Sequence, residues 1–104
     1  MSHGYANDET YALCATIDND EALYIACREY VRELLTSVPT MTEQTIGVNL
    51  KNRLQAWAFG GGWGWPDAPR QFNDVLRYFS PSQMAAVNEE DLAETVLSSL
   101  EAAP

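Results

Sequence analysis

Apolar residues between positions 23 and 35 recur at the spacing of an α-helix. The apolar face of this segment consists of Leu23, Cys27, Tyr30 and Leu34, with Tyr24, Val31 and Leu35 beside it. The charged residues of the segment are expected to face solvent; they are Arg28, Glu29, Arg32 and Glu33. Pro39 ends the segment, because proline cannot continue the hydrogen-bond ladder of a helix. An amphipathic helix of this kind has to pack its apolar face against other elements.

Side-chain capping signals indicate where helices begin. Asp18, with Glu21 three residues later, is predicted to cap the helix that runs to about Thr36. Thr40 and Glu43 form a second such pair ahead of another helix. The other predicted helix starts are at Asn7 or Asp8, at Ser80 followed by Pro81 and Gln83, and at Asn88. Residues 12–17 are also compatible with a buried strand.

Later segments repeat the helical spacing. Their apolar stripes are Ile46, Leu50, Leu54 and Trp57, then Phe72, Val75, Leu76 and Phe79, and finally Leu92, Val96 and Leu100. Gly47 is a weak point in the first of these helices, and Lys51 and Arg53 lie off its stripe. The stripe of the last helix suits a homodimer face as well as a core. The sequence therefore predicts an all-α fold, a single-domain bundle of five to six short helices over residues 1–104, with residues 1–7 flexible.

The stretch FGGGWGWPDAPR, residues 59–70, is expected to form a Gly/Trp-rich loop between helices. It does not match a phosphate-binding loop, because no Lys-Ser/Thr follows its last glycine and no strand precedes it. In the simplest interpretation Trp63 and Trp65 fold back onto the core. Alternatively one tryptophan stays exposed and anchors a partner, since tryptophan is enriched among binding hot spots. A small-ligand pocket is the third interpretation.

The acidic residues are concentrated toward the two ends of the sequence. The net charge is −9, with −5 over residues 1–40, +1 over 41–80 and −5 over 81–104. Acidic ends repel phosphate backbones and attract basic protein surfaces. We therefore expect no direct nucleic-acid binding, and a partner that is a basic host protein or nucleoprotein complex.

Two groups of acids join Trp63 and Trp65 as candidate partner-binding residues. They are Asp18, Asp20 and Glu21 in the first group, and Glu89, Glu90, Asp91 and Glu94 in the second. Both groups lie at predicted helix starts, where acids oppose the helix dipole favourably, so capping and solvation is the simpler interpretation. General acid–base chemistry or metal binding would require the acids to converge on a pocket.

Candidate catalytic or metal-binding residues are not evident. His3 is the single histidine, and no general base is apparent beside a serine or cysteine. The run DNDEALY lacks the glycine and the glutamate that a calcium-binding EF-hand loop needs. We predict no catalytic residues, no metal and no cofactor, and a protein that is not an enzyme. Cys14 and Cys27 form no CxxC motif and are expected to be reduced and buried.

The distribution of apolar residues argues against a membrane protein. No apolar run approaches the ~18 residues of a membrane span, and the first residues, MSHGYANDET, lack the basic and hydrophobic parts of a signal peptide. We expect a soluble protein of the host-cell cytoplasm without a membrane partner.

Two segments carry a resemblance to known proteins. Residues 4–24 fit the pattern Y-x-N-x-x-T-W followed by N-D-E-x-L-Y, with Tyr11 in place of the tryptophan, and residues 86–94 supply the second match. In these segments the chain resembles a small family of phage and mobile-element proteins. The resemblance implies a small protein from a bacterial virus or plasmid, and it supplies no catalytic residues.

These features favour an acidic inhibitor of a host defence complex, in the style of anti-CRISPR or antirestriction proteins. Such an inhibitor would occlude a basic nucleic-acid-binding surface. The alternative is a host-protein modulator or assembly accessory that binds through the Trp loop. A small-ligand-binding domain is the third hypothesis.

Overall fold

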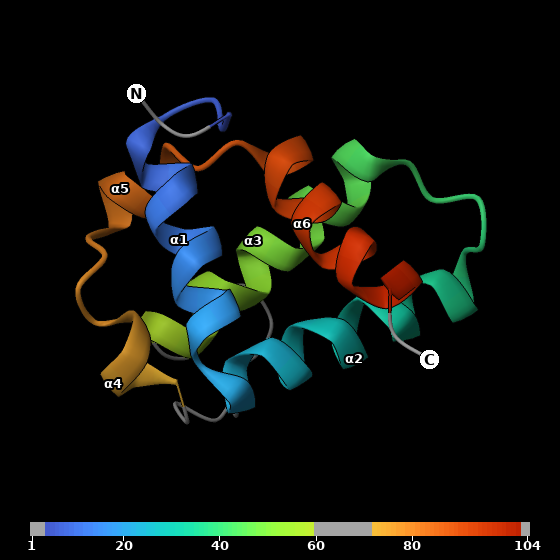
Figure 1. Ribbon diagram of the computed structural model, residues 1–104, viewed down its shortest axis with the longest axis horizontal. Helices are drawn as coiled ribbons and strands as arrows, with labels where there is room; N and C mark the ends of the chain where they lie inside the picture. The colour runs from blue at the N-terminus through green and yellow to red at the C-terminus, as the bar shows by residue number, and fades with distance from the viewer. Residues whose placement is uncertain (1–3, 60–71, 103–104) are drawn as a thin grey trace.

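Residues 12–17 belong to a helix in the structure, a computed structural model that describes residues 4–59 and 72–102. Within these ranges the chain forms helices and no strand, so the predicted all-α fold is confirmed and the strand alternative is wrong. The helices, shown in Figure 1, are α1 (Asp8–Asn19), α2 (Glu21–Ser37), α3 (Glu43–Phe59), α4 (Asn73–Leu76), α5 (Pro81–Ala85) and α6 (Glu89–Ala102). In α1 the buried residues recur with helical spacing, and they are Thr10, Leu13, Cys14 and Ile17.

The junction between α1 and α2 is a single residue, Asp20. Its backbone is extended, and its side chain accepts a hydrogen bond from the N–H of Leu23 at 2.9 Å. Asp18 therefore does not cap α2 as predicted, because α1 continues through it to Asn19. The segment 18–20 reads Asp-Asn-Asp, and either aspartate is a good capping residue. The cap lies at the second aspartate, two residues later than expected.

The other helix starts are set by local side-chain caps. Oδ1 of Asn7 accepts from the N–H of Thr10 at 2.8 Å, which confirms the start of α1. The capping box of Ser80 and Gln83 is present with Pro81 at the first turn of α5, as predicted. For α3 the cap is Thr42 and not Thr40, since Oγ1 of Thr42 accepts from the N–H of Thr45 at 3.2 Å.

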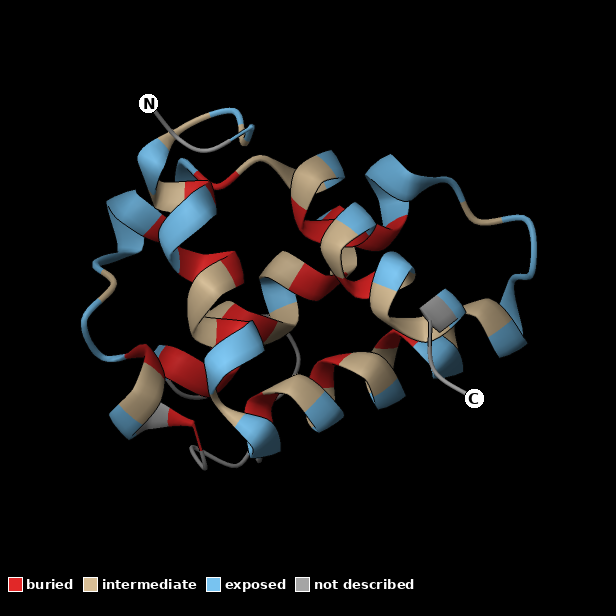
Figure 2. Ribbon diagram, in the orientation of Figure 1, coloured by how far each residue is buried: buried red, intermediate tan, exposed pale blue. Residues whose placement is uncertain are grey.

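The centre of the fold is the packing of α3 against α6. Helix α3 crosses the middle of the molecule in Figure 1 and also contacts α2, α4 and α5, while α6 contacts α1 and α2. Buried positions face this centre from every long helix (Figure 2). Gly47 of α3 is buried against the backbone of Glu89, where α6 begins. Gly47 therefore lets the backbones of these helices come close together and is not simply a weak point of α3.

Helix α6 uses its apolar stripe inside the fold. Leu92 and Val96 are buried, and Leu100 packs against the same core. This stripe is thus occupied within one chain and is not free to serve as a dimer face.

Cys14 and Cys27 are free and buried, as expected, and burial raises the pKa of their thiols to about 11 and about 12.

Candidate functional site

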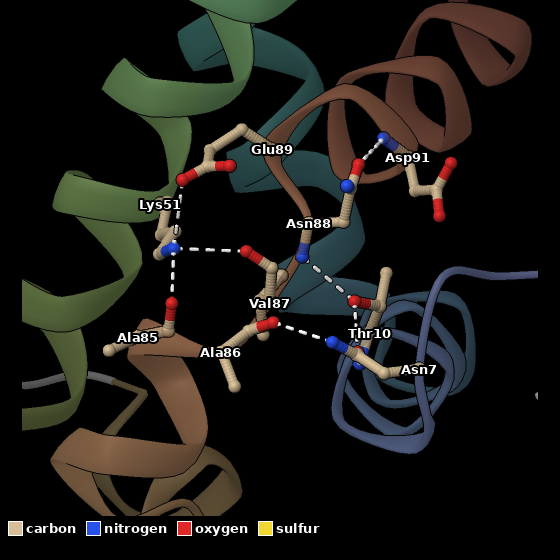
Figure 3. A network of polar contacts seen from close by, with 9 residues as sticks. All are labelled: Asn7, Thr10, Lys51, Ala85, Ala86, Val87, Asn88, Glu89 and Asp91. Atoms are coloured by element: carbon tan, nitrogen blue, oxygen red, sulfur yellow. Dashed lines mark hydrogen bonds and ion pairs between the residues drawn. The ribbon is translucent and has the colours of Figure 1, made fainter.

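The first turns of α1 and α6 lie side by side. The N–H of Asn88, which precedes α6, donates to Oγ1 of Thr10 at 2.8 Å. Nδ2 of Asn7, the cap of α1, donates to the carbonyl oxygen of Ala86 at 2.8 Å. Figure 3 shows both bonds between the two helix starts. Residues that are 78 and 79 positions apart in the sequence are joined in this way.

This junction joins the starts of two helices that both carry acids, Asp8 and Glu9 on α1 and Glu90, Asp91 and Glu94 on α6, and we call these five residues the acidic edge. Glu9 and Asp91 are half-buried and the other three are exposed. Oδ2 of Asp91 accepts from the N–H of Ala6 at 2.8 Å, which fixes that carboxylate. Acids at a helix N-terminus stabilise the helix by about 0.3–1 kcal/mol each, because they oppose the positive end of its dipole. The two helix starts therefore tolerate this concentration of negative charge.

Glu89 faces into the fold and is not part of the acidic edge. Its Oε1 forms an ion pair with Nζ of Lys51 at 3.0 Å. The same Nζ donates to the carbonyl oxygens of Ala85 at 2.7 Å and Val87 at 2.9 Å (Figure 3). The hydrogen bond from Lys51 lowers the pKa of Glu89. Glu89 thus has a role within the structure, which differs from its expected place on a partner surface.

The first predicted group of acids lies at the far end of α1, where α1 meets α2. Asp18 is ten residues along the helix from Asp8, about 15 Å by helical rise. Asp20 is half-buried and caps α2, while Asp18 and Glu21 are exposed. Partial burial raises the pKa of the Asp18 carboxyl. The two predicted groups are therefore separate surfaces and do not converge on one site.

Replacing Asp18 with asparagine is expected to stabilise the protein by about 0.5 kcal/mol at pH 7, because its charge lies at the negative end of the α1 dipole. The raised pKa of Asp18 leads to the same expectation. It means that folding disfavours the charged carboxylate, so removing the charge should stabilise the folded protein. The matched control is Asp8→Asn at the other end of α1, which is expected to destabilise by a similar amount. Urea unfolding midpoints measure both, and a loss of stability in Asp18→Asn would contradict the dipole argument.

Two half-buried arginines of the described ranges pack against aromatic rings, and the exposed Arg77 lies 5.1 Å from the ring centre of its neighbour Tyr78. The guanidinium of Arg53 lies 4.8 Å from the ring centre of Tyr30 and 5.7 Å from that of Trp57. The guanidinium of Arg28 lies 5.3 Å from the ring of Tyr24 and is half-buried, although the sequence pattern places it in solvent. These contacts are cation–π interactions. The guanidinium groups of Arg53 and Arg28 are thus held against the protein's own aromatic rings.

Exposed charge is consequently almost all negative. Arg32 and Arg77 are the exposed basic residues of ranges 4–59 and 72–102. The exposed acids of the same ranges are Asp8, Asp18, Glu21, Glu29, Glu33, Glu43, Asp74, Glu90, Glu94 and Glu101. The ratio of acids to bases among these exposed residues is therefore ten to two, against fifteen to six in the whole sequence.

The acidic edge includes two residues that the sequence interpretation did not select. Asp8 and Glu9 are visible in the sequence as an acidic first turn, but nothing local places them beside α6. A further surface residue, Tyr5, packs its ring 5.9 Å from that of Tyr11 next to this edge. The candidates Trp63 and Trp65 lie outside the described residues.

The described residues do not gather into a metal-binding arrangement, since no group of three or more His, Cys, Asp or Glu side chains among them is placed to hold an ion. In the same part of the chain, no helix has the length and apolar character needed to cross a membrane.

Compared with known proteins, the chain matches no protein-family model, no curated protein and no solved structure. The surface itself is therefore the basis for a functional proposal.

Proposed function

We propose that the chain is a non-enzymatic interaction protein that binds a basic protein surface through the acidic edge. The observation that supports this is the exposed charge: two helix starts that carry acids are joined to each other, while most cations of the described ranges are packed against aromatic rings or backbone oxygens. A surface of this kind attracts basic partners over a distance of about one Debye length and raises the association rate.

A nucleic-acid-binding cleft is the basic surface that best fits such a partner. Its lysines and arginines are arranged to neutralise phosphates, and the exposed carboxylates of the acidic edge carry charge of the same sign as phosphates. The resemblance of residues 4–24 and 86–94 to phage and mobile-element proteins adds a biological setting. We therefore propose inhibition of a host defence complex, in the anti-CRISPR or antirestriction style, by occlusion of such a cleft.

Neutralising the acidic edge is expected to abolish partner capture. The test variant combines Asp8→Asn, Glu90→Gln, Asp91→Asn and Glu94→Gln. The matched control removes the same charge from exposed acids elsewhere, with Glu29→Gln, Glu33→Gln, Glu43→Gln and Glu101→Gln. Each protein is used to capture partners from a bacterial lysate at increasing salt, and captured proteins are identified by mass spectrometry. We expect basic nucleic-acid-binding proteins to be retained by wild type and control, lost from the edge variant, and released as salt rises.

Two outcomes would contradict the proposal. Equal loss of capture in both variants would mean that only net charge matters and that the edge has no special role. Capture that is insensitive to salt, survives in the edge variant and is lost on Trp63→Ala or Trp65→Ala would assign binding to the Trp loop. Circular dichroism of both variants confirms that each is folded before capture is compared.

A further inference from the structure

A cavity lies between the segment before α1 and the first turns of α6. Its volume is about 380 Å³, and its lining residues are Gly4, Tyr5, Asp91, Glu94, Thr95 and Ser98. One wall is the segment that precedes α1, and the other is one face of α6, where residues three and four apart are neighbours. The volume is at the small end of the range of ligand sites, about 300–1,000 Å³, so it suits a single small group.

The groups around the cavity favour a positive charge. Carboxylates at 91 and 94 only accept hydrogen bonds, and none of the lining residues that the structure describes is a lysine, arginine or histidine. The single proton of the Thr95 hydroxyl has two acceptors within the protein, the carbonyl oxygen of Asp91 at 3.0 Å and Sγ of Cys14 at 3.4 Å, so Oγ1 meets a ligand as an acceptor. An aromatic ring, that of Tyr5, completes the lining and can also attract a cation.

The walls are held in place by bonds within the protein. The N–H of Ala6 donates to Oδ2 of Asp91 at 2.8 Å, which ties the first wall to the second. The N–H of Asp91 donates to Oδ1 of Asn88 at 3.0 Å. The ring of Tyr5 rests 5.9 Å from that of Tyr11 on α1. Acids at a helix start are ordinary capping residues, but here they line a preformed space that a group can enter.

We infer that this cavity takes one guanidinium or ammonium group from a basic side chain of the partner protein. A metal ion fits less well, because two carboxylates supply fewer ligands than the six to eight oxygens that calcium takes, and one Asp91 oxygen is already used by Ala6. A planar guanidinium matches the remaining carboxylate oxygens and can pair with them through two hydrogen bonds. The inference rests on the proposed function, which supplies the partner protein as the source of the cation. It adds the chemical group by which that partner would be held.

The direct test uses Nα-acetyl-arginine amide as the probe and the citrulline amide, which is neutral and of nearly the same shape, as its control. Each is titrated into the full chain while backbone amide resonances are followed by NMR. We expect the arginine probe to shift the amides of residues 4–6 and 91–98 in a saturable way, and the citrulline probe to leave them in place. Absence of saturable shifts, or equal shifts with both probes, would overturn the inference.

Variants link the binding to the cavity. Glu94→Gln is expected to weaken the arginine probe about five-fold, the effect of one partly exposed ion pair. Asp91→Asn is expected to weaken it similarly while keeping an acceptor for the N–H of Ala6. The matched control is Glu101→Gln, an exposed acid on the same helix outside the cavity, which should bind as wild type does. An unchanged affinity in both cavity variants would overturn the inference.

The two proposals fail in different ways. If the arginine probe does not bind but neutralising the acidic edge still abolishes partner capture, the cavity inference fails and the proposed function stands. If the probe binds and capture does not depend on the edge, the cavity is a site for a small cation, such as a free polyamine, and both the proposed function and the protein source of the cation fail.

Discussion

Gly47→Ala is expected to lower the free energy of unfolding by about 2 kcal/mol or more. An alanine Cβ at this position would overlap the carbonyl oxygen of Glu89, and it would lie 2.5 Å from the carbonyl carbon and 2.8 Å from Cβ of the same residue. These are atoms of the backbone and of its first side-chain carbon, so the helices would have to separate. Overpacking in a core usually costs about 1–3 kcal/mol, and it acts here at the central contact of the fold.

The helix propensities of the two residues predict the opposite sign. Alanine in the interior of a helix is favoured over glycine by about 1 kcal/mol. Gly47→Ala lowers the unfolding free energy only if the cost of the steric overlap is larger than this gain in helix propensity. A measured loss of stability would therefore show that α3 and α6 are in close contact at Gly47. Asn52→Ala, at an exposed position of α3, is the control and should be neutral or slightly stabilising. Urea unfolding measures both, and a Gly47→Ala variant as stable as the wild type would contradict the close contact.

Helix starts could be predicted where their signal is local. Ser80 with Gln83, and Asn88 with the N–H of Asp91, are caps whose partners lie three residues away, and both were identified from sequence. The cap of α2 was placed two residues early because the segment 18–20 offers two aspartates and the sequence does not show where α1 stops. Propensity alone does not resolve such a choice.

Contacts between distant residues could not be predicted in this way. Gly47 appeared as a weak point because its partner, Glu89, lies 42 positions later. Lys51 was placed off the apolar stripe, which is correct, but its bonds to residues 34 to 38 positions away are a property of the folded chain. The acidic edge has the same origin, since both acidic helix starts are visible in the sequence and only the fold brings them together.

Lys51→Met is expected to cost about 2–3 kcal/mol of unfolding free energy. Methionine keeps much of the aliphatic stem of this side chain, which is 12% exposed, but removes the ammonium that donates to three oxygens. The carbonyl of Val87 and the carboxylate of Glu89 would then be partly buried without their donor, and hydrogen bonds to charged groups contribute about 1.5–3 kcal/mol. Water can reach the carbonyl of Ala85 more easily, which limits the loss. Urea unfolding at pH 7 measures the effect.

The substitution Glu89→Gln distinguishes the contribution of the ion pair from that of the hydrogen bonds between Lys51 and the backbone carbonyl oxygens. In Glu89→Gln the side chain still accepts from Lys51 and the bonds to Ala85 and Val87 remain, so the cost at pH 7 should be below that of Lys51→Met. A cost as large as that of Lys51→Met would mean that the charge pair, and not the capture of carbonyl oxygens, makes Lys51 important.

The contribution of Glu89 to stability depends on pH with a sign that follows from its lowered pKa. Its carboxylate is favoured in the folded state, so the contribution is fully present above the unfolded pKa of about 4.3 and is lost as pH falls through the lower folded value. The difference in unfolding free energy between wild type and Glu89→Gln should therefore shrink toward zero below about pH 4. In the background of Lys51→Met, which removes the main cause of the lowered pKa, the same substitution should show little of this pH dependence. A difference that persists unchanged in both backgrounds would place the effect of Glu89 outside its pairing with Lys51.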